Sequence, residues 1–317
     1  MTVQTNTPRM LVTTPWNHAF IHDRLPADGK LNGWSVQVDE FPAETDVWVV
    51  WGNLPRNMQV NCRKTYYVTE EVHDRRAYNQ NFLAQFDEVI SSRTDIVHPV
   101  ITPTFELGTW HCGPSYDELG KLSSITKTEI ISVVSSDLTD LPGHKKRYAF
   151  VNKLIGHFKD KLHVYGRGFN PIAEKWNALA PYKYSIAIEN NAINGYFSEK
   201  LTECFLSHTM PVYAGAPDID QYFDKDALCI INPDDFAGSV RAIEELLAED
   251  PYDSVLPKII RQKEQYLQRY HIFNALSLAI GKPDALPLKR KRLQPEGNFL
   301  KPSLFKRAAQ RIIQKLP

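Results

Sequence analysis

The sequence predicts an α/β protein built of two Rossmann-like domains that face each other across a cleft. Short runs rich in β-branched and aromatic residues occur in two groups, and in the second group they alternate with helical patterns. A proline-rich connector at 98–114 separates the groups. Strands that alternate with helices form a parallel sheet covered on both faces. We therefore expect one such unit on each side of the connector.

The first group supplies four expected strands. Each is a short β-branched or aromatic run that ends in turn residues. They lie at 9–15 (RMLVTTP), 46–52 (DVWVVWG), 64–69 (KTYYVT) and 86–92 (FDEVISS). We assign them to an N-terminal domain of residues 1–118.

The second group has the strand–helix alternation of a doubly wound sheet. The expected strands lie at 129–136, 162–166, 182–189, 211–215 and 227–231, and the expected helices near 146–158, 198–208, 234–249, 252–270 and 272–280. We assign residues 119–281 to a C-terminal domain and residues 282–317 to a separate tail.

Length and composition limit the class of protein. A chain of 317 residues with 43% hydrophobic residues buries one large core or two medium ones. Its net charge is zero, so the molecule as a whole has no electrostatic attraction to nucleic acid. The four cysteines lack metal-knuckle or redox-motif spacing, which is typical of free thiols in a reducing compartment.

Neither a signal peptide nor a membrane-spanning run is recognisable, which favours a cytoplasmic location. The tail from 282 to 317 nevertheless holds ten lysine and arginine residues against two acidic ones. Apolar residues recur at helical spacing in 304–316, and together with KRKR at 289–292 this predicts a basic amphipathic helix suited to an anionic membrane surface. The alternative is that the tail packs back on the protein, and that its first part crosses to the N-terminal domain.

The stretch NGYFSEKLTECFLSHTMPVYAG, residues 194–215, holds the most informative pattern. Its Asn-Gly pair indicates a turn, and Ser198 is a suitable N-cap for a helix whose first turn contains Glu199 and Lys200. Ligands bind beyond the carboxyl ends of the strands in such a sheet, and a helix N-terminus there suits phosphate. Lys200 would add charge for a diphosphate, and Glu199 would accept hydrogen bonds from a ribose diol. The alternative is an ordinary solvated helix start.

This part of the chain resembles a known family. The elements that carry the resemblance are RYAFVNKL (147–154), VYGRGF (164–169), YKYSIAIENN (182–191), GYFSEKLTECF (195–205) and SHTMPVYAGAPDIDQYF (207–223). In content and order they resemble the donor-binding half of the α-1,3/α-1,4-fucosyltransferases, family ten of the glycosyltransferases. The resemblance implies a two-domain GT-B fold that uses GDP-β-L-fucose and inverts the anomeric centre.

The resemblance also assigns donor-binding roles position by position. It implies that Arg147 and Lys200 neutralise the diphosphate, that Glu199 holds the ribose, and that Asn190 and Tyr196 line the donor pocket. Fixed cations of this kind stabilise the charge that grows on a departing diphosphate.

Two further positions of the donor half follow from the same resemblance. Gly166 would give a backbone that the nucleotide can approach closely, and Arg167 beside it varies in chemistry across the family. Ser198 stands where the family usually has threonine, which keeps the capping role.

An inverting transferase also needs a base that accepts the proton of the attacking hydroxyl. The resemblance places this base in the N-terminal, acceptor-binding domain, where KTYYVTEEVHD makes Glu70 the candidate with Glu71 as its neighbour. Both carboxylates could equally be surface groups beyond a strand end. Other polar and aromatic residues follow strands and are weaker acceptor-binding candidates: Trp16, Asn17, His18, Trp51 and Asn53. Core packing or loop structure is the alternative for each.

No metal or other cofactor is expected. The Asp218-x-Asp220 pair has the pattern with which other sugar transferases hold Mn²⁺ or Mg²⁺, but Arg147 and Lys200 already supply cations. The glycine-rich YGRGFN lacks the third glycine of a dinucleotide-binding loop, which disfavours a nicotinamide-dependent oxidoreductase.

The combined interpretation is a fucosyltransferase, cytoplasmic or peripheral on the inner face of the cytoplasmic membrane. It would transfer L-fucose to a GlcNAc- or Gal-containing glycan, with α-1,3 linkage, in lipopolysaccharide or other bacterial surface glycan synthesis or in protein glycosylation. Two alternatives stay open: a related transferase that uses another nucleotide sugar, and a non-catalytic glycan- or nucleotide-binding protein on the same scaffold.

Overall fold

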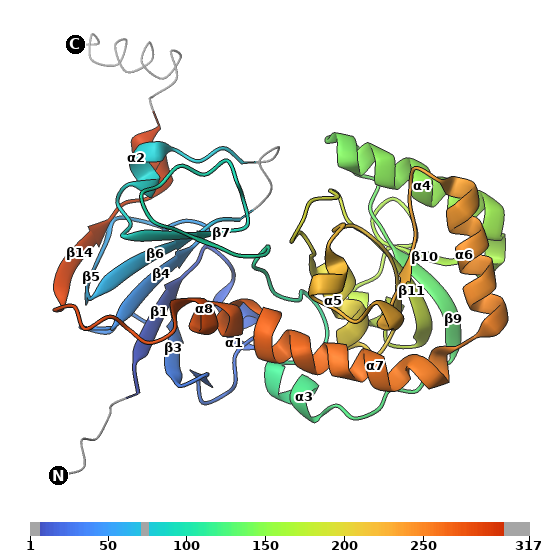
Figure 1. Cartoon of the computed structure of the whole chain (residues 1–317), viewed down its shortest axis with the longest axis horizontal. Coiled ribbons are helices and arrows are strands. Elements are labelled where there is room, and N and C mark those ends of the chain that lie inside the picture. Colours follow the sequence, from blue (N-terminus) through green and yellow to red (C-terminus); the bar gives the residue numbers. More distant parts are fainter. Residues whose placement is uncertain (1–6, 71–75, 301–317) are drawn as a thin grey trace, which may run out of the picture. The chain divides into compact units, whose positions relative to one another are not determined.

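The computed structural model describes residues 7–70 and 76–300, and the chain divides into two compact units (Figure 1). The first unit combines three separate pieces of chain: the N-terminal piece to Asn17, Ser35–Pro103, and the C-terminal piece from Lys282. The second unit comprises His18–Trp34 and Thr104–Gly281. Each unit contains a parallel sheet, which confirms the predicted fold class of two Rossmann-like domains of GT-B type.

The first unit is built on a parallel sheet in the order β3-β1-β4-β6-β7-β8. Its strands are β1 (Arg9–Thr13), β3 (Trp34–Val38), β4 (Val47–Trp51), β6 (Lys64–Val68), β7 (Glu88–Ser91) and β8 (Ile101–Pro103). All five residues of β4 are buried, as expected for a central strand covered on both faces. Trp48 of this strand also satisfies its indole nitrogen, which donates to Thr13 Oγ1 at 2.9 Å. A short helix, α2 (Gln80–Leu83), joins the core.

The C-terminal segment contributes a strand to this first unit. β14 (Lys289–Leu293) pairs antiparallel with β5 (Met58–Cys62), and Leu293 enters the core. The prediction that KRKR at 289–292 belongs to an amphipathic helix is therefore wrong, because these residues form β14. Lys291 binds both Asp87 oxygens at 2.7 and 2.8 Å, so this charge stabilises the unit. The predicted helix at 304–316 lies outside the described residues.

The second unit has a parallel sheet in the order β10-β9-β11-β12-β13. Its strands are β9 (Glu129–Val134), β10 (His163–Tyr165), β11 (Tyr182–Ile188), β12 (Met210–Ala214) and β13 (Cys229–Ile230), and all pair in parallel. All five overlap the expected strands. The helices of the unit are α1 (His18–His22), α3 (Tyr116–Lys121), α4 (Pro142–Phe158), α5 (Glu199–Leu206), α6 (Phe236–Glu249), α7 (Tyr252–Gln265) and α8 (Ile272–Ile280), with a short strand β2 (Lys30–Leu31).

Helices cover both faces of this second sheet (Figure 1). On one side α4 and α6 pack together through Phe150 and Phe236, whose ring centroids lie 5.9 Å apart. On the other side α5 contacts β11, β12 and α7. Beyond α7 the chain forms a π-helical turn, Tyr266–Tyr270, before α8 begins. This arrangement leaves the carboxyl ends of β11 and β12 next to the start of α5.

The boundary between the units differs from the expected one after residue 118. Residues 104–118 group with the second unit, because Trp110 and Cys112 pack in the same core as Leu119, Ile131 and Val133. Within the described part of the chain, none of the helices combines the length and the apolar character that a membrane span requires.

Candidate active site

The stretch that follows β11 has the local structure that the sequence predicts. Asn194 and Gly195 form a turn, with Gly195 at φ +70°, a value that favours glycine. Ser198 caps α5, and its side chain accepts from the Lys200 backbone N–H. Glu199 and Lys200 therefore lie in the first turn of α5, where the helix presents free N–H groups.

A buried carboxylate that the sequence analysis missed organises this helix start. Glu189 comes directly after β11, and its side chain is fully buried. It accepts from both the backbone nitrogen and the hydroxyl of Ser198, each at 2.7 Å. Burial raises the pKa of Glu189, and the ammonium of Lys200, 3.7 Å away, opposes that rise. A methyl group on Gly215 would lie 2.6 Å from Glu189 Cγ, so glycine is required beside it.

The Glu199–Lys200 pair is part of the same network. Lys200 Nζ lies 3.0 Å from Glu199 Oε1 and 3.1 Å from Ser198 Oγ. Burial alone would raise the pKa of Glu199, but the ammonium groups of Lys200 and Lys175 outweigh burial and hold this pKa well below its ordinary value. Burial alone would lower the pKa of Lys200, and the carboxylates of Glu199 and Glu189 raise it instead. Both side chains therefore carry full charge at neutral pH.

Lys175 and Glu203 lie behind this pair and are a second feature that sequence reasoning missed. Lys175 forms an ion pair with Glu203, which also accepts from the His111 backbone N–H at 2.6 Å. Lys175 acts electrostatically on Glu199 as well. Glu203 lies on α5 itself, whereas Lys175 comes from a 3₁₀ turn that precedes β11 in the sequence, so only the fold brings this ammonium group to α5.

Arg147 approaches the site from α4. This buried guanidinium donates to the side-chain oxygen of Asn190 and, at 2.9 Å, to Ser136 Oγ. Its Nε finds no acceptor among the described residues. Burial lowers the pKa of Arg147, and the carboxylates of Glu189 and Glu199 partly oppose this shift. Four predicted donor residues, namely Arg147, Asn190, Glu199 and Lys200, thus belong to one charged network, and Tyr196 acts electrostatically on Arg147 within it.

A pocket of about 170 Å³ opens at this network, beyond the ends of β11, β12 and β13. Arg147, Glu189 and Asn190 line it together with Gly143 and Gly215. Gly143 lies in the first turn of α4, and a Cβ there would lie 1.7 Å from the Asn190 carbonyl oxygen. A helix N-terminus and a guanidinium therefore face the same space, which suits an anionic ligand.

Gly166 and Arg167 are placed differently from the other predicted donor residues. Gly166 has φ +113°, and a Cβ there would lie 1.9 Å from the Ser135 carbonyl oxygen. The close approach that requires glycine is thus to the chain's own backbone, next to the Ser136 that holds Arg147. Arg167 is 63% exposed and binds Asp137, with 3.1 Å between Arg167 Nε and Asp137 Oδ1.

The Asp-x-Asp pair has structural contacts in this unit. Asp218 Oδ1 accepts from the Gly195 backbone nitrogen at 2.8 Å and so fixes the turn before α5. Asp220 lines a neighbouring pocket of about 330 Å³ near β12 and β13, which shares Ala214, Gly215 and Ile231 with the pocket at the charged network. Across residues 7–70 and 76–300, no cluster of three or more His, Cys, Asp or Glu side chains is arranged to hold a metal ion. The expected independence from metal stays a prediction.

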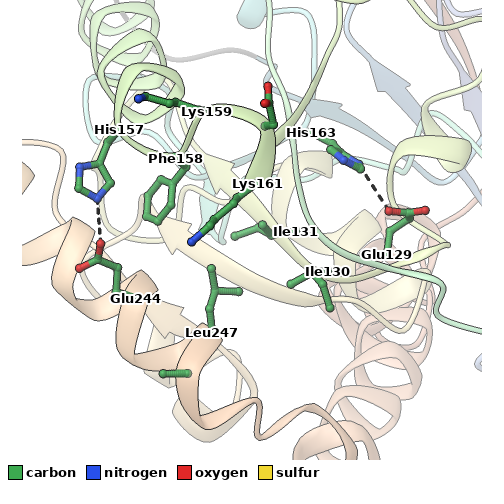
Figure 2. A pocket seen from close by; sticks show the side chains of 12 residues that line it. Glu129, Ile130, Ile131, His157, Phe158, Lys159, Lys161, His163, Glu244 and Leu247 are labelled. Carbon is green, nitrogen blue, oxygen red and sulfur yellow. Dashed lines mark hydrogen bonds and ion pairs between the residues drawn. The ribbon is translucent and has the colours of Figure 1, made fainter.

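A larger pocket of the second unit, about 910 Å³, lies at the opposite, amino ends of β9 and β10 (Figure 2). Its floor is apolar, with Ile130, Phe158 and Leu247. Two ion pairs line it, His157 with Glu244 and His163 with Glu129, at 2.9 and 3.7 Å. None of the predicted donor residues lines this pocket, so we place the donor site at the smaller one.

The predicted base, Glu70, lies beyond the carboxyl end of β6 in the first unit. Its Oε1 accepts from the Trp16 indole nitrogen at 3.0 Å, and its Oε2 binds Arg76 Nη1 at 3.1 Å. Tyr78 hydrogen-bonds to the backbone of the same residue. A Cβ on Gly52 would lie 2.5 Å from the carboxylate, so glycine is needed where β4 ends. Glu71, the predicted neighbour, lies outside the described residues.

The weaker acceptor candidates separate by exposure. Trp51 is buried at 4% exposure, and Asn53 Oδ1 accepts from two backbone nitrogens, so both fit the packing and loop alternative. Trp16 is 43% exposed and lies against Trp51, with 6.0 Å between ring centroids. His18 is exposed at the start of α1 and belongs to the second unit.

Two parallel-sheet units, one of which carries a charged network at its strand ends, define a glycosyltransferase fold of the GT-B type. The comparisons name the family. Residues 125–271, which make up less than half of the chain, match the family described as glycosyltransferase family 10 (fucosyltransferase), C-terminal part. The predicted resemblance is thereby confirmed for the donor-binding half.

One curated relative and two solved structures are similar to this chain. The α-(1,3)-fucosyltransferase FucT of Helicobacter pylori is 32% identical over 77 residues, a stretch that covers 24% of this chain and only 16% of that protein. An α1,3-fucosyltransferase crystal structure shares 17% identity with a TM-score of 0.51, covering 86% of this chain and 94% of that one. The N-terminal domain of Candida albicans trehalose-6-phosphate phosphatase has the same TM-score at 9% identity, covering 86% and 95%. At these identities the two structures show likeness of fold alone.

Proposed function

We propose that this protein is an inverting fucosyltransferase that transfers L-fucose from GDP-β-L-fucose to a GlcNAc- or Gal-containing glycan, with α-1,3 linkage. The observation that carries the proposal is that the family match and the charged network lie in the same part of the chain. The range that matches family 10 contains the charged network of Arg147, Asn190, Glu199 and Lys200 at the end of β11. Helicobacter pylori FucT, by its name an α-(1,3)-fucosyltransferase, supports the sugar and the linkage.

The donor side would act by charge stabilisation. The α4 N-terminus and Arg147 would bind the diphosphate with Lys200, while Glu199 would accept hydrogen bonds from the ribose hydroxyls. Negative charge grows on the diphosphate as its bond to the sugar breaks, and fixed cations stabilise that charge. Both cations are held in place before substrate arrives, Arg147 by Asn190 and Ser136, and Lys200 by carboxylates.

Glu70 would act as the base. Its carboxylate would take the proton of the acceptor hydroxyl as that oxygen bonds to C1 of fucose, and the bond from C1 to the diphosphate would break with its electron pair leaving on GDP. Attack from the face opposite the leaving group inverts C1. Trp16 and Arg76 orient the two carboxylate oxygens, as a positioned base requires. The exposed face of Trp16 beside it would suit the apolar face of a sugar ring.

The reaction would need no metal, because protein cations supply the charge that Mn²⁺ or Mg²⁺ supplies elsewhere. We place the protein in the cytoplasm or on the inner face of the cytoplasmic membrane, in synthesis of lipopolysaccharide or another surface glycan. No nucleic acid partner is proposed. A different nucleotide sugar and a silent binding protein are the competing possibilities.

A two-stage experiment tests the proposal against these competitors. A thermal-shift panel of GDP, UDP, CMP and NAD identifies the nucleotide, and we expect stabilisation by GDP alone. GDP-fucose and GDP-mannose are then incubated with a glycan acceptor array. Stabilisation by UDP but not GDP would overturn the donor assignment, and GDP binding without transfer to any GlcNAc or Gal acceptor would favour the silent scaffold.

A further inference from the structure

The C-terminal segment that follows β14 reaches the candidate base within the first unit. A 3₁₀ turn, Glu296–Phe299, ends this segment, and Phe299 packs on Phe82 of α2 with 6.1 Å between ring centroids. The segment is fixed by Asn79, which donates from its side chain to the Phe299 carbonyl at 3.0 Å. A carboxylate more than 200 residues from Glu70 in sequence thereby enters the same cluster.

Glu296 is held in one orientation by several contacts. Its Oε1 accepts from the Asn79 backbone nitrogen at 2.9 Å, and its own backbone nitrogen donates to Asn53 Oδ1 at 3.1 Å. Its Oε2 binds Arg76 Nη2 at 2.9 Å. The Glu296 side chain is 14% exposed, so this charge pair is largely removed from water.

Arg76 bridges two carboxylates. Nη1 lies 3.1 Å from Glu70 Oε2, whereas Nη2 lies 2.9 Å from Glu296 Oε2 and 3.1 Å from the Gly52 carbonyl oxygen. The guanidinium carbon also lies 4.6 Å above the Tyr78 ring. A planar guanidinium fixed at both ends holds its partners in a defined geometry, which a lysine ammonium cannot do.

This shared arginine bears on the basicity of Glu70. A cation that pairs with a carboxylate lowers its pKa, and a second negative charge nearby raises it. The charged and titratable groups that face the cluster from the described residues are Tyr67, Arg76, Tyr78, Arg93 and Glu296. Among these, Glu296 is the carboxylate that pairs with Arg76 together with Glu70, so its negative charge partly offsets the effect of the guanidinium on Glu70.

We propose that Glu296 is a positioning residue for transfer. It anchors Arg76 so that the guanidinium orients Glu70, and its negative charge limits how far Arg76 lowers the basicity of Glu70. The inference rests on the proposed role of Glu70. It assigns a task in the reaction to a segment that returns from the end of the second unit's sequence, and Glu296 itself touches neither sugar nor nucleotide.

Two substitutions test this with opposite signs. Glu296→Gln keeps the shape and the acceptor for Asn79, but leaves all of the Arg76 charge to Glu70. The pKa of the base should fall, and the acidic limb of the pH profile of kcat/KM should move to lower pH by about one unit. Arg76→Gln removes the cation, so the same limb should move to higher pH. In the double variant, the Glu296→Gln change should not move the acidic limb further down, because the Arg76 cation through which Glu296 acts on Glu70 is absent.

Turnover provides a second readout. A weaker base should lower kcat of Glu296→Gln roughly 3- to 10-fold at neutral pH, while KM for GDP-fucose stays the same. Asp284→Asn is the matched control, because it removes one carboxylate from the same segment, where Asp284 pairs with Lys64. Its pH profile should equal that of the parent protein. Melting temperatures of all variants confirm that each is folded.

Trp16 fluorescence separates this inference from the proposed function. The Trp16 indole donates to Glu70 Oε1, so its emission should change as Glu70 is protonated in the ligand-free protein, and a Trp16→Phe variant identifies that signal. A lower midpoint in Glu296→Gln with an unchanged kinetic profile would support the positioning of Glu70 but refute its role as base. An unchanged midpoint in both Glu296→Gln and Arg76→Gln would overturn the inference.

Discussion

Replacement of Lys200 by methionine should weaken GDP binding and stability together. The substitution keeps the apolar stem but removes the ammonium beside Glu199 and Glu189. A charge-assisted contact to a diphosphate contributes about 1.5–3 kcal/mol, so the Kd for GDP should rise roughly 10- to 150-fold. Because Glu189 is fully buried, it would also lose its nearby cation, and the free energy of unfolding should fall by about 1–3 kcal/mol.

Calorimetry with GDP at a fixed ionic strength of about 0.15 M measures the first effect, and urea unfolding measures the second. Lys121→Met is the control, because it removes the same charge from an exposed position on α3. An equal loss of affinity in Lys121→Met would attribute the effect to net charge. Unchanged GDP affinity in Lys200→Met and in Arg147→Gln, with both variants folded, would refute the phosphate roles of these cations.

Four other outcomes follow from the sites described above. Glu70→Gln should lower turnover by about 10²–10⁴-fold without changing GDP affinity, and Glu71→Gln should be much milder; a reversal between them in a coupled GDP-release assay would move the base by one position. Transfer should persist in EDTA, and complete loss that Mn²⁺ restores would establish a metal requirement. Truncation after Leu300 should reduce sedimentation with anionic liposomes, whereas a full-length chain that binds none would exclude the membrane role of the tail. Burial alone would raise the pKa of Asp87, but Lys291 and the backbone hydrogen bond at Thr65 lower this pKa below the ordinary value of 3.8. Ionised Asp87 therefore stabilises the fold above pH 3.8, and this stabilisation is lost as the pH falls below that value. In Lys291→Met, the free energy of unfolding measured with urea should fall less steeply as the pH is lowered through this range.

Sequence reasoning found the strands whose residues are mostly apolar, because an apolar run indicates a buried strand. VWVVW of β4 is apolar throughout, and it was identified. The alternating MQVNC of β5 is a weaker signal, and it was missed together with its partner β14. KRKRL has no strand propensity of its own, and forms β14 because β5 offers backbone partners and Asp87 offers a charge. Because β14 forms through its pairing with a strand far away in the sequence, local composition could not predict it.

The candidate site divides in the same way. The turn, the N-cap and the first-turn pair at Ser198, Glu199 and Lys200 follow from local rules, and the sequence predicts them well. Glu189 follows β11 directly and is easily seen in the sequence, but its role in holding the Ser198 N-cap depends on its burial there, which the sequence does not show. The contact of Lys175 with Glu203 and that of Arg76 with Glu296 join residues from separate parts of the chain. No spacing rule connects such residues before the fold is known.

The pairing of β14 with β5 has a consequence for synthesis on the ribosome. Arg292 and its partner Gln59 are 233 residues apart, so at about 5–20 residues per second the N-terminal half of this pair waits roughly 10–50 s for its partner strand to be made. The second unit is mostly one continuous piece and is complete by Gly281, before β14 exists. We expect the later part of the nascent chain to acquire its structure first. The apolar face of β5 stays without its neighbour until Leu293 has been synthesised, which makes it a natural binding site for chaperones during that interval.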